Sequence, residues 1–242
     1  MTPSHFDREP LGNEQMPRQV AQGTDPGARA QIYLQPIAAP SILGLFGFAG
    51  ATFMVAANMA GWYGTPNSMY ALIPFAVMFG GFAQFLSGMW AFKARDGIAT
   101  AMHGMWGSFW IAYGVLGWLM LTGRIPDPGL AFPELGYWFI VLAAITWMGM
   151  LAAFAANLSL VWVLGTLAAG STLEAIARLA GSEACQIAAG YLFIVSAIVA
   201  WYTASALMFE EAFGHPILKA GRRRTEQRTI TVGAEPGVIR GQ

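Results

Sequence analysis

Between Ala39 and Gly61 the chain runs for 23 residues without an Asp, Glu, Lys, Arg or His. A helix of that length crosses the hydrocarbon core of a bilayer, which is about 30 Å thick. Three glycines, Gly44, Gly47 and Gly50, lie inside the stretch, and small residues let membrane helices approach each other closely. The stretch therefore predicts a transmembrane helix packed inside a bundle rather than a plain lipid anchor.

Five further apolar segments follow, at roughly residues 69–92, 100–122, 137–156, 158–179 and 185–209. Charged residues make up only 11% of the chain, against about 25% in soluble domains. The segment at 158–179 has the weakest apolar pattern, and Glu174 and Arg178, four residues apart, would share one face of its outer end. We predict an all-α membrane protein with six transmembrane helices per protomer.

The two ends of the chain are polar. Residues 1–36 contain five prolines and lack the short apolar core of a signal peptide, so we expect a disordered N-terminal tail. Residues 37–212 would form the membrane domain, and residues 213–242 a basic C-terminal tail. Lys and Arg concentrate in both tails and in the loop at 93–96, whereas the opposite side holds only Arg124 and Arg178. This bias predicts cytoplasmic termini in a multi-pass protein of the inner (plasma) membrane.

The composition disfavours several classes of function. A formal net charge of zero gives no overall attraction to nucleic acid. The single cysteine, Cys185, excludes a cysteine metal cluster, and Ser108 has no base and acid with which to form a hydrolytic triad. No phosphate-binding loop of Walker type is present, and no carboxylate falls in the middle of a span. We expect no enzyme activity, cofactor or metal, and the pattern favours a channel or transporter for a small solute.

An unpaired polar group inside a membrane span is costly, and the two amides and the histidine inside the predicted spans each need a reason. Asn58 lies late in the first span, Gln84 in the middle of the second and His103 near the start of the third. The two amides fit either hydrogen bonding between helices or donation to a passing anion. His103 fits either packing or a proton relay, since an unperturbed histidine titrates near pH 6.5, at about neutral pH.

Four motifs occur in order: PSILGLFGFA at Pro40–Ala49, GGFAQFLSG at Gly80–Gly88, GSFW at Gly107–Trp110 and FGHPILKAG at Phe213–Gly221. Together they resemble the acetate uptake transporter family, which comprises the YaaH-type acetate–succinate permeases of bacteria and their fungal acetate/ammonia relatives. The family's first motif is Asn-Pro-Ala-Pro-Leu-Gly-Leu. This chain keeps Pro40 and the final Leu-Gly-Leu but departs from the motif at Ala39, Ser41 and Ile42.

The resemblance implies a six-helix protomer that assembles as a homohexameric ring, with one pore in each protomer. It implies passage of acetate and other small monocarboxylates, sometimes succinate. It also implies a constriction of Phe, Tyr and Leu side chains, which fall on Phe48, Trp106 and Leu167 of this chain. Trp106 replaces the tyrosine, is bulkier, and donates only through its indole N–H.

A small carboxylate is ionised at neutral pH, because its pKa is about 4. A pore must therefore offer the anion hydrogen-bond donors or admit the protonated acid. The candidate substrate-binding residues are Ser41, Leu43 and Gly44, at the positive end of the first helix, together with Asn58, Gln84 and Ser108. His103 is the candidate proton relay. The constriction would pass only small solutes stripped of water.

Two other functions remain open. A constriction without fixed charge suits a neutral solute such as ammonia or urea equally well, and acetate itself fits either an anion channel or proton-linked transport. The chain also fits a non-transporting membrane sensor or scaffold that uses its two tails to bind partners.

Overall fold

The computed structural model describes residues 37–65 and 67–221, and every element in them is a helix. The elements are α1 (Pro40–Met59), α2 (Ser68–Phe75), η1 (Ala76–Ala83), α3 (Gln84–Ala94), α4 (Gly97–Leu121), α5 (Pro133–Ala153), α6 (Leu158–Ala180) and α7 (Glu183–Phe213). The predicted N-terminal tail at 1–36, and the part of the predicted C-terminal tail (213–242) that follows residue 221, lie outside the described residues.

Six spans in the described part of the chain are long and apolar enough to cross a membrane, which confirms the predicted all-α, six-helix fold. The second span is a continuous column from Ser68 to Ala94 that contains α2, η1 and α3. The weakly patterned fifth span, α6, reaches Ala180, so that Glu174 and Arg178 both lie within the helix.

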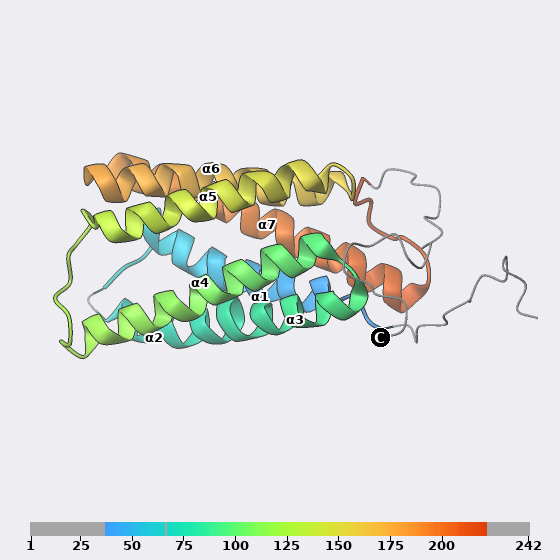
Figure 1. The fold of residues 1–242 in the computed structure, drawn as a ribbon, viewed down its shortest axis with the longest axis horizontal. Helices are drawn as coiled ribbons and strands as arrows, with labels where there is room; N and C mark the ends of the chain where they lie inside the picture. The colour runs from blue at the N-terminus through green and yellow to red at the C-terminus, as the bar shows by residue number, and fades with distance from the viewer. Residues whose placement is uncertain (1–36, 66, 222–242) are drawn as a thin grey trace, which may run out of the picture. The chain divides into compact units, whose positions relative to one another are not determined.

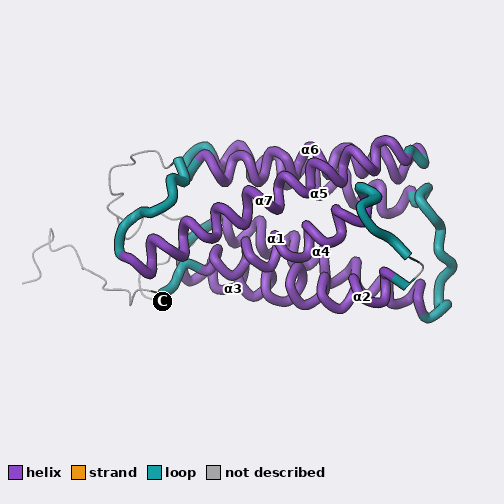
Figure 2. The backbone as a smooth tube through the Cα atoms, turned by 180° about the vertical axis from the view of Figure 1, so that it is seen from behind, coloured by secondary structure: helices purple, strands orange, loops and turns teal. Residues whose placement is uncertain are grey.

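The helices pack around a circuit in their order in the chain, and α7 packs back on α1. Helix α5 packs on α6, α6 on α7, α7 on α1, and α1 on the column of η1 and α3, which in turn packs on α4. A thinner contact between α4 and α5 closes the circuit. Figures 1 and 2 show α5 beside α6 and α3 beside α4 from opposite directions. Residues from α1, α4, α5, α6 and α7 consequently meet in one buried core cluster.

The second span contains a stretch of π-helix, η1, that begins two residues after Pro74. Proline has no backbone N–H to continue the α-helical ladder and its ring crowds the preceding turn, and π-helical turns are one way in which a helix absorbs such a break. At Gly80 in η1, an added Cβ would lie 2.7 Å from Trp110 Cγ and 2.8 Å from Ala51 Cβ. The missing side chain lets η1 lie against both α4 and α1.

Helices α3 and α4 approach each other at glycines. A Cβ at Gly88 would lie 2.6 Å from the backbone nitrogen of Gly104, and a Cβ at Gly107 would lie 2.5 Å from that of Phe85. Backbone atoms cannot move aside as a flexible side chain can, so any larger residue would force the two helices apart. The turn between them is short: Arg95 adopts a left-handed conformation, and Asp96 then caps α4 by accepting a hydrogen bond from Ala99 N–H at 2.9 Å.

The start of α1 and the end of α7 lie at the same end of the bundle. Ala39 N–H donates to the carboxylate of Glu211 at 3.4 Å. The segment after α7 then returns to the α5–α6 turn, where Ser159 N–H donates to the Ala220 carbonyl. It is also held by Tyr202, whose hydroxyl donates to the Lys219 carbonyl at 3.1 Å. Below, this end is called the inner end and the opposite one the outer end.

Candidate functional site

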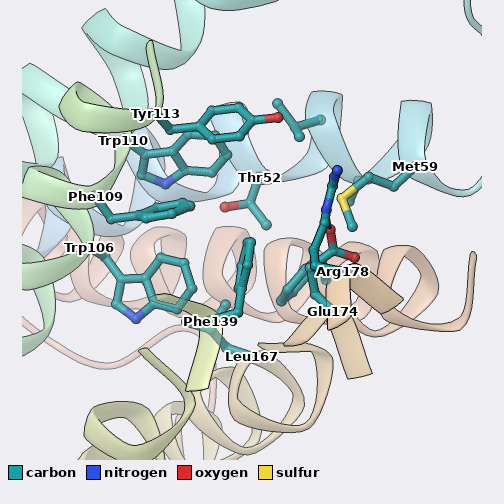
Figure 3. A pocket seen from close by; sticks show the side chains of 13 residues that line it. Thr52, Met59, Trp106, Phe109, Trp110, Tyr113, Phe139, Leu167, Glu174 and Arg178 are labelled. Carbon is teal, nitrogen blue, oxygen red and sulfur yellow. Dashed lines mark hydrogen bonds and ion pairs between the residues drawn. The ribbon is translucent and has the colours of Figure 1, made fainter. Parts of the chain in front are cut away.

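The three residues that the family resemblance assigns to a constriction come together in the structure. Phe48 on α1, Trp106 on α4 and Leu167 on α6 are each at most 3% exposed and belong to the same core cluster. The ring centroids of Phe48 and Trp106 lie 6.5 Å apart at an interplanar angle of 70°. Trp106 and Leu167 both line one internal cavity (Figure 3).

Helix α4 lines that cavity with rings at helical spacing, from Trp106 through Phe109 and Trp110 to Tyr113. Phe109 contacts Trp106 edge-on with centroids 5.4 Å apart, and it stacks on Tyr113 at 5.7 Å. Phe139 of α5 lies edge-on to Phe109. We call this narrow space, of about 30 Å³, the aromatic cavity. Its walls are mainly apolar, so the few polar atoms that face it stand out.

Five polar side chains line the aromatic cavity away from the constriction, namely Thr52, Trp110, Tyr113, Glu174 and Arg178. Figure 3 shows Glu174 and Arg178 on the side opposite the rings of α4. Glu174 Oε1 accepts from Arg178 Nε at 2.7 Å. Thr52 Oγ1, Trp110 Nε1 and Glu174 Oε2 are buried without a hydrogen-bond partner in the described residues. Most buried polar groups in proteins are hydrogen-bonded, so three free ones around one cavity indicate a place for a polar guest.

A wider space, the outer cavity, adjoins the aromatic cavity at the outer end. Its volume is about 320 Å³, and it shares Val55, Met59, Tyr113 and Arg178 with the aromatic cavity. The loop that follows α4 adds Asp127 to its lining. Arg178 also donates from Nη1 to the Gly129 carbonyl of that loop at 3.4 Å. The two cavities lead in sequence from the outer end toward the constriction.

The other side of the constriction holds His103, Gly44 and Ser87. His103 is buried, and its Nδ1 has no partner in the part of the chain that the structure describes. A Cβ at Gly44 would lie 2.6 Å from both His103 Nδ1 and Ser87 Oγ, so the missing side chain makes room for these two residues. Ser87 Oγ donates to the Pro40 carbonyl at 2.6 Å. The candidate relay therefore lies toward the inner end, one turn or less from the constriction along α4.

The remaining predicted binding residues are scattered. Ser41 is half-buried in the first turn of α1, whereas Leu43 is 45% exposed and turns away from the core. Gln84 is buried at the start of α3, and its side-chain oxygen has no partner in residues 37–65 and 67–221. Asn58 donates to the Tyr63 carbonyl at 2.9 Å, and the exposed Ser108 donates to the Gly104 carbonyl of its own helix. Of these residues, only Asn58 lines the outer cavity, and none lines the aromatic cavity.

The sequence reasoning did not identify Thr52, Tyr113 or the Glu174–Arg178 pair as lining residues. A signal for them was present, because residues four or seven apart share a helix face. Thr52 follows Phe48 by four residues, Tyr113 follows Trp106 by seven, and Glu174 follows Leu167 by seven. Extending each predicted constriction residue along its helix would have outlined the aromatic cavity. In the described residues, no group of three His, Cys, Asp or Glu side chains is placed to hold a metal ion.

The chain is similar in sequence to known proteins over most of its length. The chain is 24% identical over 185 residues to the succinate-acetate/proton symporter SatP of Escherichia coli K12, which covers 76% of this chain and 96% of that protein. It is 26% identical over 232 residues to acetate permease A of Emericella nidulans, covering 85% and 76% of the two chains. It is also 26% identical over 172 residues to ammonia transport outward protein 2 of Saccharomyces cerevisiae, covering 69% and 60%.

The fold has a counterpart among solved structures. The structure described as that of the bacterial acetate channel SatP superposes with a TM-score of 0.70 at 24% identity, covering 77% of this chain and all of that one. The model of the GPR1/FUN34/yaaH family matches residues 21–217. This is the family that the four motifs resemble. With most of its length matched and its six spans in place, this chain is a multi-pass membrane protein that belongs to the GPR1/FUN34/yaaH family.

Proposed function

We propose that the chain transports acetate and similarly small monocarboxylates through a pore in each protomer. The observation that carries this proposal is that two adjoining cavities lead up to the constriction inside a single six-helix unit. It is supported by the names of the relatives, since those in Escherichia coli and Emericella nidulans are an acetate symporter and an acetate permease. Succinate, which the bacterial name includes, is a second candidate substrate.

Passage through the constriction depends on size and on loss of water. Phe48, Trp106 and Leu167 offer only apolar atoms, and hydrophobic constrictions exclude hydrated ions. An acetate anion would have to leave its water behind at a high cost, whereas neutral acetic acid would not. This physical argument favours proton-linked transport over an anion channel. His103, on the inner side of the constriction with a free ring nitrogen, is the proposed acceptor of the proton when the acid leaves.

The same proposal extends to the orientation of the protomer in the membrane and to its oligomeric state. Lys93 and Arg95 lie at the inner end, so the positive-inside rule assigns that end, with both termini, to the cytoplasm. Large apolar side chains, among them Phe75, Trp90 and Trp162, are at least half exposed on the outside of the bundle. Such a surface suits lipid and neighbouring protomers. We propose a homohexamer in the bacterial inner membrane, or in the plasma membrane of another cell type.

Ammonia transport is the second candidate, because one relative is named for it and a constriction without charge also passes a small neutral base. The two functions change internal pH in opposite directions. Acetic acid entering a vesicle releases a proton inside, whereas ammonia entering takes one up. A pH-sensitive dye trapped in proteoliposomes would separate them after addition of acetate or of ammonium.

A size series tests the proposal directly. Purified protein in liposomes should take up labelled acetate faster than propionate and butyrate, because each added methylene must pass the constriction. The Leu167→Ala variant should reduce that preference. A wild-type protein that moves no monocarboxylate faster than empty liposomes would refute the proposal.

A further inference from the structure

The buried ion pair of Glu174 and Arg178 carries an inference about how substrate and proton meet. The side chain of Glu174 is 1% exposed and that of Arg178 is 14% exposed. Their bond joins Oε1 to Nε at 2.7 Å, and it leaves Oε2 with no partner in the residues that the structure describes. Both residues line the aromatic cavity, and Arg178 also lines the outer cavity.

This arrangement is costly if its only role is structural. Burying a charged pair is repaid only when the remaining hydrogen-bonding positions are also filled, and Oε2 is not filled. A carboxylate accepts at both oxygens, and a guanidinium presents five N–H donors in a fork suited to carboxylates. Arg178 donates from Nε to Glu174 and makes a long contact from Nη1 to the Gly129 carbonyl. Both partners thus retain capacity for a guest.

Resting on the proposed function, we propose that Arg178 binds the carboxylate of the substrate and that Glu174 takes up the proton that travels with it. Arg178 is the cation that lines the two cavities in the described residues. It sits where the outer cavity narrows into the aromatic one, because it lines both. A carboxylate that enters from the outer end therefore meets this guanidinium before it reaches the constriction.

The charges balance at each step. At rest, anionic Glu174 and cationic Arg178 sum to zero. When a proton from bulk water binds Oε2, a new O–H bond makes Glu174 neutral, and Arg178 then binds the acetate anion, so the sum is again zero. The O–H bond on Glu174 breaks as its proton moves to acetate, which leaves as acetic acid, and the original pair re-forms. Proton uptake and acetate binding are therefore coupled, because either one alone would leave an unpaired charge in the cavity, where it is strongly disfavoured.

The handover would take place before the constriction. Glu174 follows Leu167 by seven residues on α6, which corresponds to about 10 Å along the helix axis on the same face. Only neutral acid would then enter the ring of Phe48, Trp106 and Leu167. The free Oγ1 of Thr52 and Nε1 of Trp110 line the same cavity, and they provide hydrogen bonds for the acid on its way.

Few other titratable groups face this pair. Helix α4 contributes Tyr113, whose hydroxyl in Figure 3 points toward the side of Arg178, and the loop after α4 contributes Asp127 to the outer cavity. The residues of α1, α5 and α7 that line the aromatic cavity carry no charge; they include Met59, Phe139 and Phe193. Glu174 is therefore the carboxylate placed to exchange a proton inside the aromatic cavity, while Asp127 stays in the loop.

The test uses full-length protein in liposomes and labelled acetate, with and without an inward proton gradient. In Glu174→Gln, the gradient should no longer accelerate uptake, and uptake at equal pH should also fall, because acetate then reaches the constriction as the anion. In Arg178→Gln, the KM for acetate should rise about tenfold or more, as for the loss of a charge-assisted bond, and Arg178→Lys should restore part of it. Glu134→Gln and Arg124→Gln, exposed residues at the same end of the bundle, are the matched controls and should behave as the wild type.

The double variant Glu174→Gln/Arg178→Gln leaves no lone buried charge, so it carries the test if a single variant does not fold. It should lose both the gradient response and the low KM. Wild-type uptake together with an unchanged gradient response in Glu174→Gln, or in the double variant, would overturn this inference alone. Absence of uptake by the wild type would overturn the proposed function and this inference with it.

Discussion

Trp106 donates its indole N–H to the hydroxyl of Thr146, with a nitrogen–oxygen distance of 3.0 Å across the buried contact between α4 and α5. Thr146 in turn donates to the Leu142 carbonyl at 2.6 Å. The only polar group of Trp106 is thereby held away from the aromatic cavity. At a position where the resemblance implies tyrosine, the tryptophan contributes bulk to the constriction without a free donor.

Replacing Thr146 by valine tests this contact. The variant keeps the shape but removes the acceptor, so the buried indole N–H loses its partner at a cost of about 1–3 kcal/mol. Thermal unfolding in detergent should show a lower midpoint, and acetate uptake should change because the ring is no longer fixed. Thr166→Val is the control, since the Thr166 hydroxyl bonds only carbonyls of its own helix. Equal stability of the two variants would mean that the contact does not hold Trp106.

Shortening Leu167 should widen the constriction. In Leu167→Val the transport of propionate relative to acetate should rise by up to about tenfold, the discrimination that one methylene provides in an apolar site. Leu164, one turn away on α6 and equally buried, does not line either cavity, so Leu164→Val serves as the control. If both variants kept the wild-type ratio of rates, the constriction would lie elsewhere.

The six helices could be predicted because long apolar runs leave a chain few alternatives in a membrane. The π-helical stretch after Pro74 could not, since proline alone does not determine how a helix absorbs its missing bond. The pairing of α7 with α1 depends on contacts between residues far apart in sequence. No periodicity in one segment encodes such contacts.

The close contact between α3 and α4 at Gly88 predicts how substitutions there change the stability of the protein. Gly88→Ala would bring a methyl group to 2.6 Å from the Gly104 backbone, and this overpacking should cost about 1–3 kcal/mol. Gly104→Ala meets nothing within 4 Å and should be neutral or stabilising, because alanine is the better helix former. Differential scanning calorimetry of both variants in detergent compares their unfolding temperatures. The opposite order of stabilities would contradict the packing described here.

His103 is expected to matter for transport on the inner side of the constriction. His103→Gln keeps a polar side chain of similar size but cannot carry the proton, so gradient-driven acetate uptake should slow while exchange at equal pH is less affected. His215→Gln, at an exposed position after α7, is the matched control. An identical gradient response in His103→Gln and the wild type would leave His103 as a packing residue.

The candidate site was only partly predictable for a physical reason. Phe48, Trp106 and Leu167 were implied by the family resemblance, and the structure places all three in one cluster. Glu174 was assigned to the outer end of its helix, and a mid-span carboxylate was not expected. The structure buries Glu174 in the bundle because Arg178 one turn later partners it and the loop after α4 covers the pair. Burial of that kind depends on a loop whose path the sequence does not reveal.

The most direct test of the account is the uptake of labelled acetate into proteoliposomes that contain the purified wild-type protein, with and without an inward proton gradient. The account predicts uptake above that of empty liposomes and a clear acceleration by the gradient. Uptake that ignores the gradient would contradict proton-linked transport and indicate a passive anion pore. No acetate uptake under either condition would contradict the central claim itself.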